Sequence, residues 1–153
     1  MQLELRREAL TSANAMALIE ALNAELSLYY PERGANYFRL DSAEVDPGAG
    51  LFIVGYLERR AVGCGAVRRI DPDTAEIKRM YVLRPGRGLG VGRAILTELE
   101  LQARALGCTQ LLLETGERQL DAMRLYLRAG FERTALFGEY RSSPLSVCMK
   151  KTL

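Results

Sequence analysis

The 153-residue sequence contains no histidine, and this absence removes several kinds of catalytic site. Serine–histidine and cysteine–histidine catalysis and histidine-based metal centres all need an imidazole, so this chain alone cannot supply them. A general base must then be a carboxylate, a lysine, a tyrosine, a cysteine or an ordered water. We predict no metal site.

Cysteine, net charge and long apolar runs are also scarce. Cys64, Cys108 and Cys148 are odd in number and widely spaced, which argues against a disulfide framework. The net charge of +2 is too small by itself to predict a nucleic-acid or membrane partner. No apolar run approaches the roughly 20 residues that span a bilayer, and the N-terminus lacks the order of a secretory signal. We expect a cytoplasmic protein.

What the sequence does contain is a continuous series of strand and helix patterns, without a linker or an internal repeat. Residues 1–153 are therefore interpreted as one domain. Apolar spacing predicts helices over Ala13–Tyr30, over the segment holding Ile95 to Leu106, and over Leu120–Ala129. Gly107 is expected to follow the C-terminus of the second of these helices. A short helix or an extended segment is expected after Gly34. β-rich runs predict strands at Leu51–Leu57, Ala61–Ile70, Ala75–Leu83, Gln110–Thr115, Phe131–Phe137 and Leu145–Lys150.

The order of these elements indicates the fold class. Antiparallel hairpins come first, and a strand–helix–strand–helix series follows. This order predicts an α/β architecture in which a mixed sheet carries helices on its faces.

A glycine-rich segment, Arg87-Gly88-Leu89-Gly90-Val91-Gly92, lies between a predicted strand and a predicted helix. The first amides of a helix have no intrahelical partner, and glycines let an anion approach them closely. Arg87 and Arg93 add positive charge on either side. We expect a phosphate-bearing ligand here, although a plain helix start is the alternative. The spacing G-x-G-x-G fits neither the dinucleotide fingerprint nor the P-loop.

Two motifs resemble those of the GNAT superfamily of acyl-CoA N-acyltransferases. Arg87-x-x-Gly90-x-Gly92 after a strand resembles its motif A, and Gln119-x-x-Ala122-x-x-Leu125-Tyr126-x-x-x-Gly130-Phe131 resembles its motif B. The resemblance covers nearly the whole chain. It implies a largely antiparallel, mixed sheet of about six or seven strands with about four helices, and acetyl-CoA as co-substrate.

The resemblance also implies which residues bind the cofactor. The backbone amides of Leu89, Gly90, Val91 and Gly92 would hold the pyrophosphate. The backbone of Met80, Tyr81 and Val82 would pair with the pantetheine arm like an added strand. Gln119 stands where many members have a cofactor-binding asparagine, and it offers the same amide groups from a longer stem. A gap between the Ala75–Leu83 and Gln110–Thr115 strands would admit the thioester.

Two side chains are candidates for the chemistry. Tyr126 stands where many relatives have a general-acid tyrosine, and the alternative is a tyrosine whose ring packs in the core. Glu76 precedes Arg87 at a spacing similar to that of the base glutamate in histone-acetylating relatives. Its alternative is a strand glutamate paired with Lys78 or Arg79. Either of these cations could bind an acceptor carboxylate, or both could lie on a solvated face.

The resulting hypothesis is an enzyme that transfers the acetyl group to a primary amine of a small molecule or protein, by direct attack in a ternary complex. A non-catalytic CoA-binding module on the same fold is the alternative. A nucleic-acid-binding domain is disfavoured because no basic stripe with interleaved aromatics is present. Edge strands offer a route to a homodimer.

Overall fold

Seven strands form a single sheet, and its inner strands are rich in apolar and β-branched residues. The computed structural model describes residues 2–32 and 38–153. The strands are β1 (Leu3–Arg7), β2 (Gly50–Leu57), β3 (Arg60–Asp71), β4 (Thr74–Val82), β5 (Gln110–Thr115), β6 (Glu132–Thr134) and β7 (Val147–Thr152). Their order is β1-β2-β3-β4-β5-β7-β6, and only the β4–β5 pair is parallel. The predicted mixed, largely antiparallel sheet is confirmed.

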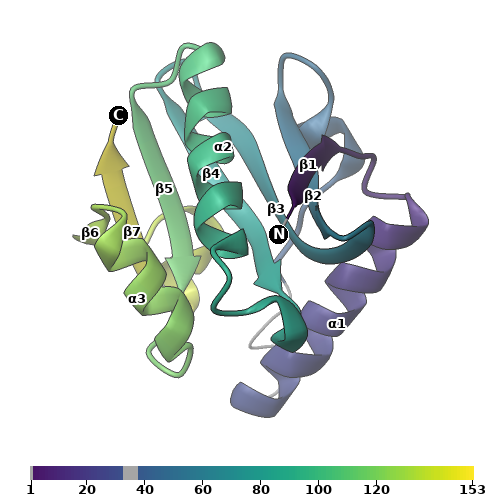
Figure 1. Cartoon of the computed structure of the whole chain (residues 1–153). Coiled ribbons are helices and arrows are strands. Elements are labelled where there is room, and N and C mark those ends of the chain that lie inside the picture. Colours follow the sequence, from purple (N-terminus) through teal and green to yellow (C-terminus); the bar gives the residue numbers. More distant parts are fainter. Residues whose placement is uncertain (1, 33–37) are drawn as a thin grey trace.

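Three α-helices cover the sheet (Figure 1): α1 (Ala13–Tyr29), α2 (Val91–Ala105) and α3 (Leu120–Arg128). The hydroxyl of Ser12 caps α1 by accepting from the Ala15 amide at 3.0 Å. Gly107, with a φ of +87°, follows the last turn of α2, as the sequence predicted.

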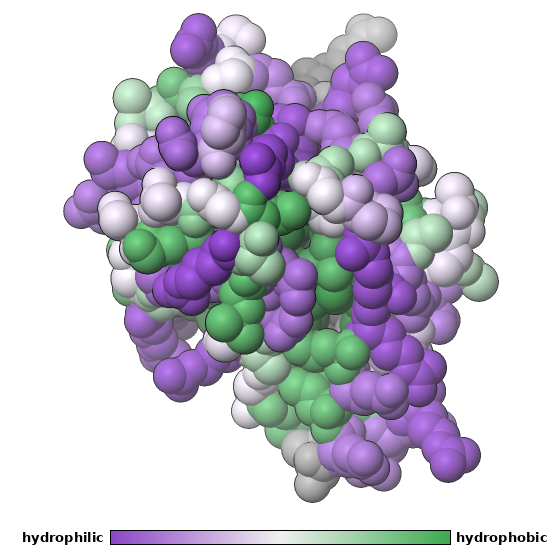
Figure 2. All heavy atoms as spheres, turned by 90° about the horizontal axis from the view of Figure 1, so that it is seen from above, coloured by the Kyte–Doolittle hydropathy of each residue, from purple (hydrophilic) through white to green (hydrophobic). Residues whose placement is uncertain are grey.

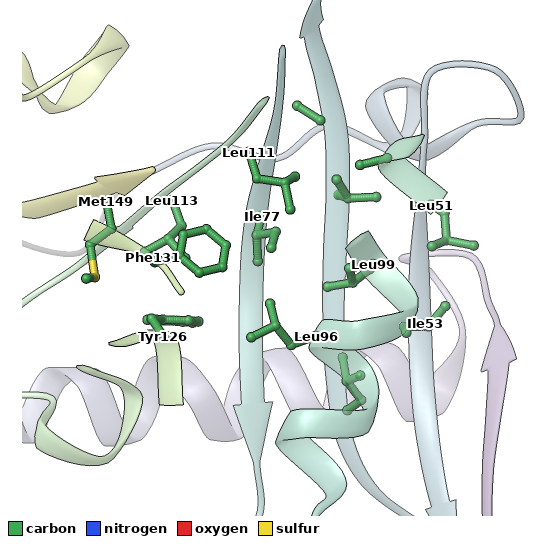
Figure 3. Packing of buried hydrophobic residues seen from close by; sticks show 14 of the residues in the cluster. Leu51, Ile53, Ile77, Leu96, Leu99, Leu111, Leu113, Tyr126, Phe131 and Met149 are labelled. Carbon is green, nitrogen blue, oxygen red and sulfur yellow. The ribbon is translucent and has the colours of Figure 1, made fainter. Parts of the chain in front are cut away.

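The apolar face of each helix sets the layer in which it lies. Leu96 and Leu99 of α2, together with Tyr126 of α3, pack on one face of the sheet against Ile77 and Leu113 (Figure 3). A second cluster on the opposite face joins apolar residues of α1 to the alternate side chains of β2 and β3: Ala15, Leu18, Phe52, Val54, Cys64 and Ala66. The sheet is therefore buried on both sides, and α1 lies opposite α2 and α3.

The expectation of about four helices is wrong for the described residues, which hold three α-helices and three short 3₁₀ helices. The region after Gly34 contains only the 3₁₀ turn Ser42–Val45, and residues 33–37 lie outside the described residues. Asp41 and Glu44 form a capping box at the start of that turn, and Asp46-Pro47-Gly48 forms a turn directly after it. Four residues between these signals are too few for an α-helix.

Two strands differ from the prediction at the edges of the sheet. β1 was not predicted, and it pairs with β2 through Leu3–Arg7, a segment rich in charge. β6 spans three residues, whereas the sequence indicated a strand over Phe131–Phe137. Edge strands are short and polar, so their apolar pattern is weak.

The surface at the upper end of Figure 1 is largely hydrophilic. Figure 2 shows hydrophilic residues over most of this face, and hydrophobic residues gathered mainly from its middle toward its lower edge. Within residues 2–32 and 38–153, no helix is both long enough and apolar enough to cross a membrane.

Candidate active site

The sheet splits between β4 and β5, the two parallel strands at its centre. Residues Thr74–Ile77 pair with Gln110–Leu113, and the recorded pairing ends there although both strands continue. β4 runs on to Val82 and β5 to Thr115. The gap that the resemblance implied between these strands is confirmed.

An irregularity in β4 accompanies the split. The register with β3 shifts between Cys64 and Ala66, where these residues face Tyr81 and Lys78. Arg79 lies in this bulge with a φ of +59°, in the left-handed region that non-glycine residues rarely adopt. Such bulges bend a strand and re-aim its side chains. The bulge therefore marks the point where β4 leaves its neighbour.

A pocket of about 90 Å³ occupies the split. Its walls come from α1, β4, β5, α3 and the segments before and after them. They include Leu22, Leu26, Tyr30, Phe38, Lys78, Arg79, Met80, Glu114, Thr115, Gln119, Tyr126, Tyr140, Leu145 and Ser146. Because α1 and α3 lie on opposite faces, two substrates could reach the pocket from opposite sides of the sheet.

The glycine loop opens α2 as the sequence predicted. Gly88 and Gly90 have φ of +76° and +84°, and a β-carbon on either would meet no atom within 4 Å. The first helical bond runs from the Ala94 amide to the Gly90 carbonyl at 3.0 Å. The amides of the first turn, residues 91–93, donate to no backbone carbonyl of the described chain. They are free to receive an anion.

The other predicted cofactor residues surround this loop. Leu89 and Arg93 are exposed, whereas Met80, Tyr81 and Val82 are half-buried. Gln119 is the N-cap residue of α3, and together with Met80 it lines the pocket.

Arg87 is held within the protein. Its Nε donates to the Val82 carbonyl at 2.8 Å, and its Nη2 donates to Glu25 Oε2 at 2.7 Å. Hydrogen bonding to Glu25 raises the pKa of Arg87, although burial opposes the shift. Arg87 therefore joins α1 to the loop.

Tyr126 of α3 lies in the pocket wall and is 5% exposed. Its ring meets Phe131 edge-on with centroids 5.9 Å apart, so part of the side chain is core, as the alternative interpretation expected. Its hydroxyl makes no hydrogen bond to a described side chain. Burial raises the pKa of this phenol, so the hydroxyl keeps its proton at neutral pH.

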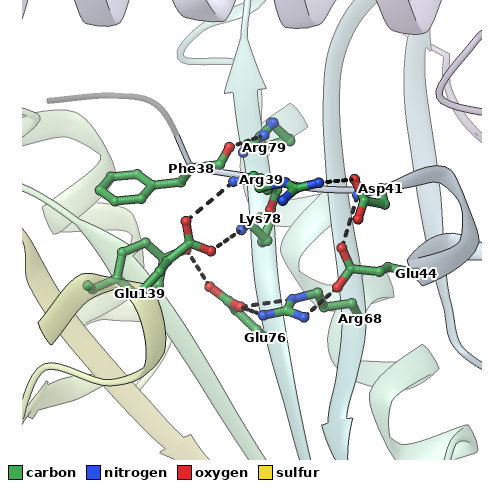
Figure 4. Close-up of polar contacts among 10 residues, drawn as sticks. Phe38, Arg39, Asp41, Glu44, Arg68, Glu76, Lys78, Arg79 and Glu139 are labelled. Atoms are coloured by element: carbon green, nitrogen blue, oxygen red, sulfur yellow. Dashed lines mark hydrogen bonds and ion pairs between the residues drawn. The ribbon is translucent and has the colours of Figure 1, made fainter. Parts of the chain in front are cut away.

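Glu76 is completely buried on β4. Arg68 Nη2 lies 2.8 Å from its Oε1, and the Tyr140 hydroxyl donates to its Oε2 at 2.6 Å. Arg68 also contacts Glu44, as Figure 4 shows. The pairing expected with Lys78 or Arg79 is thus made by Arg68. Both oxygens of Glu76 are occupied, and the residue is absent from the pocket wall described above.

The hydroxyl of Tyr140 should stabilise the fold by satisfying this buried carboxylate. We expect Tyr140→Phe to lower the free energy of unfolding by roughly 1–3 kcal/mol, because Glu76 loses a hydrogen bond that water cannot replace. Urea denaturation measures the change. Tyr29→Phe, at a tyrosine 39% exposed, is the control and should change stability by less than about 0.5 kcal/mol. Equal stability of the two variants would contradict this role.

Glu114 of β5 lines the pocket and was not singled out from the sequence. Burial, with repulsion from Glu76 and Glu139, raises the pKa of its carboxyl to about 7, while the Ser146 hydroxyl and Lys78 oppose the shift. Ser146 donates to Glu114 Oε2 at 2.5 Å. The available signal was one acidic residue in the otherwise apolar run Leu111 to Glu114. A carboxyl that titrates near neutral pH suits proton transfer.

A split mixed sheet, open amides at a helix start beside it, and an acid–base pocket in the split together define an acyl-CoA N-acyltransferase. Residues 15–131 match the Acetyltransferase (GNAT) family, and the chain belongs to that family. It is an acyl-CoA-dependent acetyltransferase, so the family and enzyme class predicted from the sequence are confirmed.

Two curated relatives and a solved structure resemble the chain. An IAA acetyltransferase of Azospirillum brasilense is 37% identical over 150 residues, or 96% of this chain and 95% of that protein. The uncharacterized N-acetyltransferase YjgM of Escherichia coli is 30% identical over 136 residues, or 84% of this chain and 81% of that protein. A Klebsiella pneumoniae protein, provisionally named an acyl-CoA N-acyltransferase, has a TM-score of 0.86 and 33% identity, covering 99% of this chain and 98% of its own.

Proposed function

We propose that the protein transfers an acetyl group from acetyl-CoA directly to a primary amine bound in the pocket between β4 and β5. The observation that carries this assignment is the presence of Glu114 and Tyr126, a carboxyl and a protonated phenol, in the wall of one pocket. β4 links the pocket to the start of α2, because Met80 lines the pocket and a β-carbon on Gly92 would lie 3.6 Å from Val82 Cγ2. A pyrophosphate on these amides would direct the pantetheine arm toward the split.

The chemistry needs a neutral amine, a polarised carbonyl and a protonated leaving group. In our proposal the Glu114 carboxylate takes a proton from the ammonium group of the acceptor, and the neutral amine then attacks the thioester carbon. The nitrogen of the tetrahedral intermediate loses its second proton to solvent as the sulfur departs. Backbone amides of Met80 or Tyr81 stabilise the developing oxyanion. Tyr126 donates a hydrogen bond to the sulfur as the carbon–sulfur bond breaks. A phenol above pKa 10 transfers its proton unfavourably to a thiol of pKa near 8.5, so hydrogen bonding is its main contribution.

Glu76 remains a second candidate for the base. Its two contacts support a positioning role, in which Arg68 and Tyr140 fix it and Tyr140 in turn forms part of the pocket wall. Substitution of each carboxylate by glutamine separates the two assignments. The rise of kcat/KM with pH should disappear only in the variant that lacks the true base.

Thiol release from acetyl-CoA, measured over a panel of amines and amino acids, tests the function. We expect turnover with at least one acceptor and measurable binding of CoA by calorimetry. CoA binding without any turnover would favour the non-catalytic module.

A homodimer formed through the exposed sheet edges is also proposed, and light scattering tests it.

The pyrophosphate site can be tested with two matched glycines of α2. Gly90 and Gly107 have φ of +84° and +87°, and a β-carbon on either meets open space. Alanine at each position should cost roughly 1–2 kcal/mol of stability, because this backbone conformation strains an L residue. Only Gly90→Ala should also weaken CoA binding, by about tenfold or more, since it displaces the anion-binding amides. Calorimetry measures the affinity of each variant for CoA. Equal affinities of Gly90→Ala and Gly107→Ala would contradict a pyrophosphate site at the start of α2.

A further inference from the structure

We infer that Arg79 binds a carboxylate of the acceptor, and that the acceptor is a free amino acid with an apolar side chain. This inference rests on the proposed function and names the substrate class for the same pocket. Three features support this inference. They are the bulge that directs Arg79, the N–H donors that the Arg79 guanidinium leaves unused, and the chemistry of the other pocket walls.

The bulge in β4 gives two successive cations a common direction. Adjacent strand residues ordinarily point to opposite faces. Here Lys78 reaches the Arg39 carbonyl, and Arg79 Nη2 donates to the Phe38 carbonyl at 2.6 Å (Figure 4). Both side chains also line the pocket. The left-handed backbone of Arg79 is strained, and such strain concentrates at functional sites.

Arg79 has donor capacity that the protein does not use. A guanidinium carries five N–H groups, and a single hydrogen bond from this one, to Phe38, is recorded among the described residues. It forms no ion pair with a described carboxylate, whereas Arg68 and Arg87 each bind a glutamate at less than 3 Å. A guanidinium binds a carboxylate through two parallel hydrogen bonds, which a single backbone carbonyl cannot provide. Arg79 therefore has an open site for an anion.

Lys78 is less suited to this role. Its side chain is 2% exposed, and its ammonium lies 3.7 Å from Glu139 Oε2 while it also contacts a backbone carbonyl. The ring of Tyr140 lies 5.8 Å away. A compact cation with these partners has little capacity left for a ligand.

The remaining walls match the other parts of an amino acid. Glu114 provides an anion for the substrate nitrogen in the same pocket as Arg79. Leu22, Leu26, Phe38 and Leu145 supply apolar surface for a side chain. Two buried hydroxyls of residues in these walls, Tyr30 and Thr115, have no hydrogen-bond partner among the described residues. A pocket with one acid, one open arginine and apolar walls complements an apolar amino acid.

The test compares amino acids with the amines that lack only the carboxylate: leucine with isoamylamine, and phenylalanine with phenethylamine. We expect the wild-type enzyme to show at least a tenfold higher kcat/KM for each amino acid. Arg79→Asn should lose this preference and leave kcat/KM for the two amines within about threefold. Asparagine is chosen because it tolerates the left-handed conformation. Arg79→Lys should restore only part of the preference, because it lacks the planar fork.

Arg39→Gln is the matched control. Its side chain is 83% exposed, and its backbone carbonyl, which Lys78 contacts, is retained. The control should keep the wild-type preference. Turnover of amines and amino acids with equal kcat/KM would overturn the inference and leave the proposed function intact. A failure of the proposed function would look different, because neither amines nor amino acids would then cause thiol release from acetyl-CoA. Calorimetry of leucine with the CoA-bound enzyme gives an independent readout, and equal affinity in wild type and Arg79→Asn would also overturn the inference.

Discussion

Replacing Tyr126 with phenylalanine is expected to lower kcat about 100-fold and to leave the affinity for acetyl-CoA unchanged. Tyr126 lies in the pocket wall, its hydroxyl has no hydrogen-bond partner among the described side chains, and its ring packs on Phe131. Phenylalanine keeps this packing and removes only the donor to the leaving sulfur. Loss of a positioned acid typically costs between 100-fold and 10,000-fold in rate. Steady-state kinetics and calorimetry with CoA separate the two effects.

The leaving group provides a sharper form of this test. An activated thioester with a less basic thiol needs less help from a hydrogen bond, so Tyr126→Phe should slow its reaction less. Tyr29→Phe on the exposed part of α1 is the control and should leave kcat unchanged. A fall in kcat that is equal for both thioesters, together with loss of thermal stability, would assign Tyr126 to the core alone.

Features set by neighbouring residues were predictable from the sequence. The glycine loop, the amphipathic helix after it and Gly107 at its end depend on local backbone conformation, and their residue types carry that information directly. The β4 strand and its hairpin with β3 were likewise predicted from apolar runs separated by turn residues. The position that we propose for the pyrophosphate follows from these local features.

Contacts between distant segments were not predictable in the same way. The alternative to a base role paired Glu76 with a neighbour on its own strand, but its partners are Arg68, across the β3–β4 ladder, and Tyr140, 64 residues away. Glu114 carries no local motif, and its raised pKa depends on β4 and on the segment before β7 folding around it. The left-handed conformation of Arg79 has no signal in an arginine. Such features arise from tertiary packing, which a single sequence encodes only through its whole fold.

Replacing Glu114 with glutamine is expected to lower kcat/KM at pH 8 by about 100-fold or more, because the amine loses its proton acceptor. The pKa of this carboxyl is about 7, so wild-type kcat/KM should rise through pH 7 as the base ionises. Glu114→Gln should lack this rise in kcat/KM, and Glu76→Gln should keep it. Loss of the rise in Glu76→Gln alone would assign the base to Glu76. The groups acting on Glu114 are Glu76, Lys78, Glu139 and Ser146, and all four are retained in the variant.

The same substitution should stabilise the protein in alkaline solution. The pKa of Glu114 is raised from 4.5 to about 7 on folding, so the folded state favours the protonated form. The favourable contribution of the Glu114 carboxyl to the free energy of unfolding is fully present below pH 4.5 and is lost as pH rises through 7. Above pH 7 the difference amounts to at most roughly 3 kcal/mol, because one unit of pKa corresponds to about 1.4 kcal/mol. Urea denaturation at pH 5 and pH 8.5 should therefore show Glu114→Gln gaining stability relative to wild type at the higher pH. This result is expected if burial of the Glu114 carboxyl costs stability. If the carboxyl instead stabilised the fold, Glu114→Gln would be less stable than wild type at both pH values.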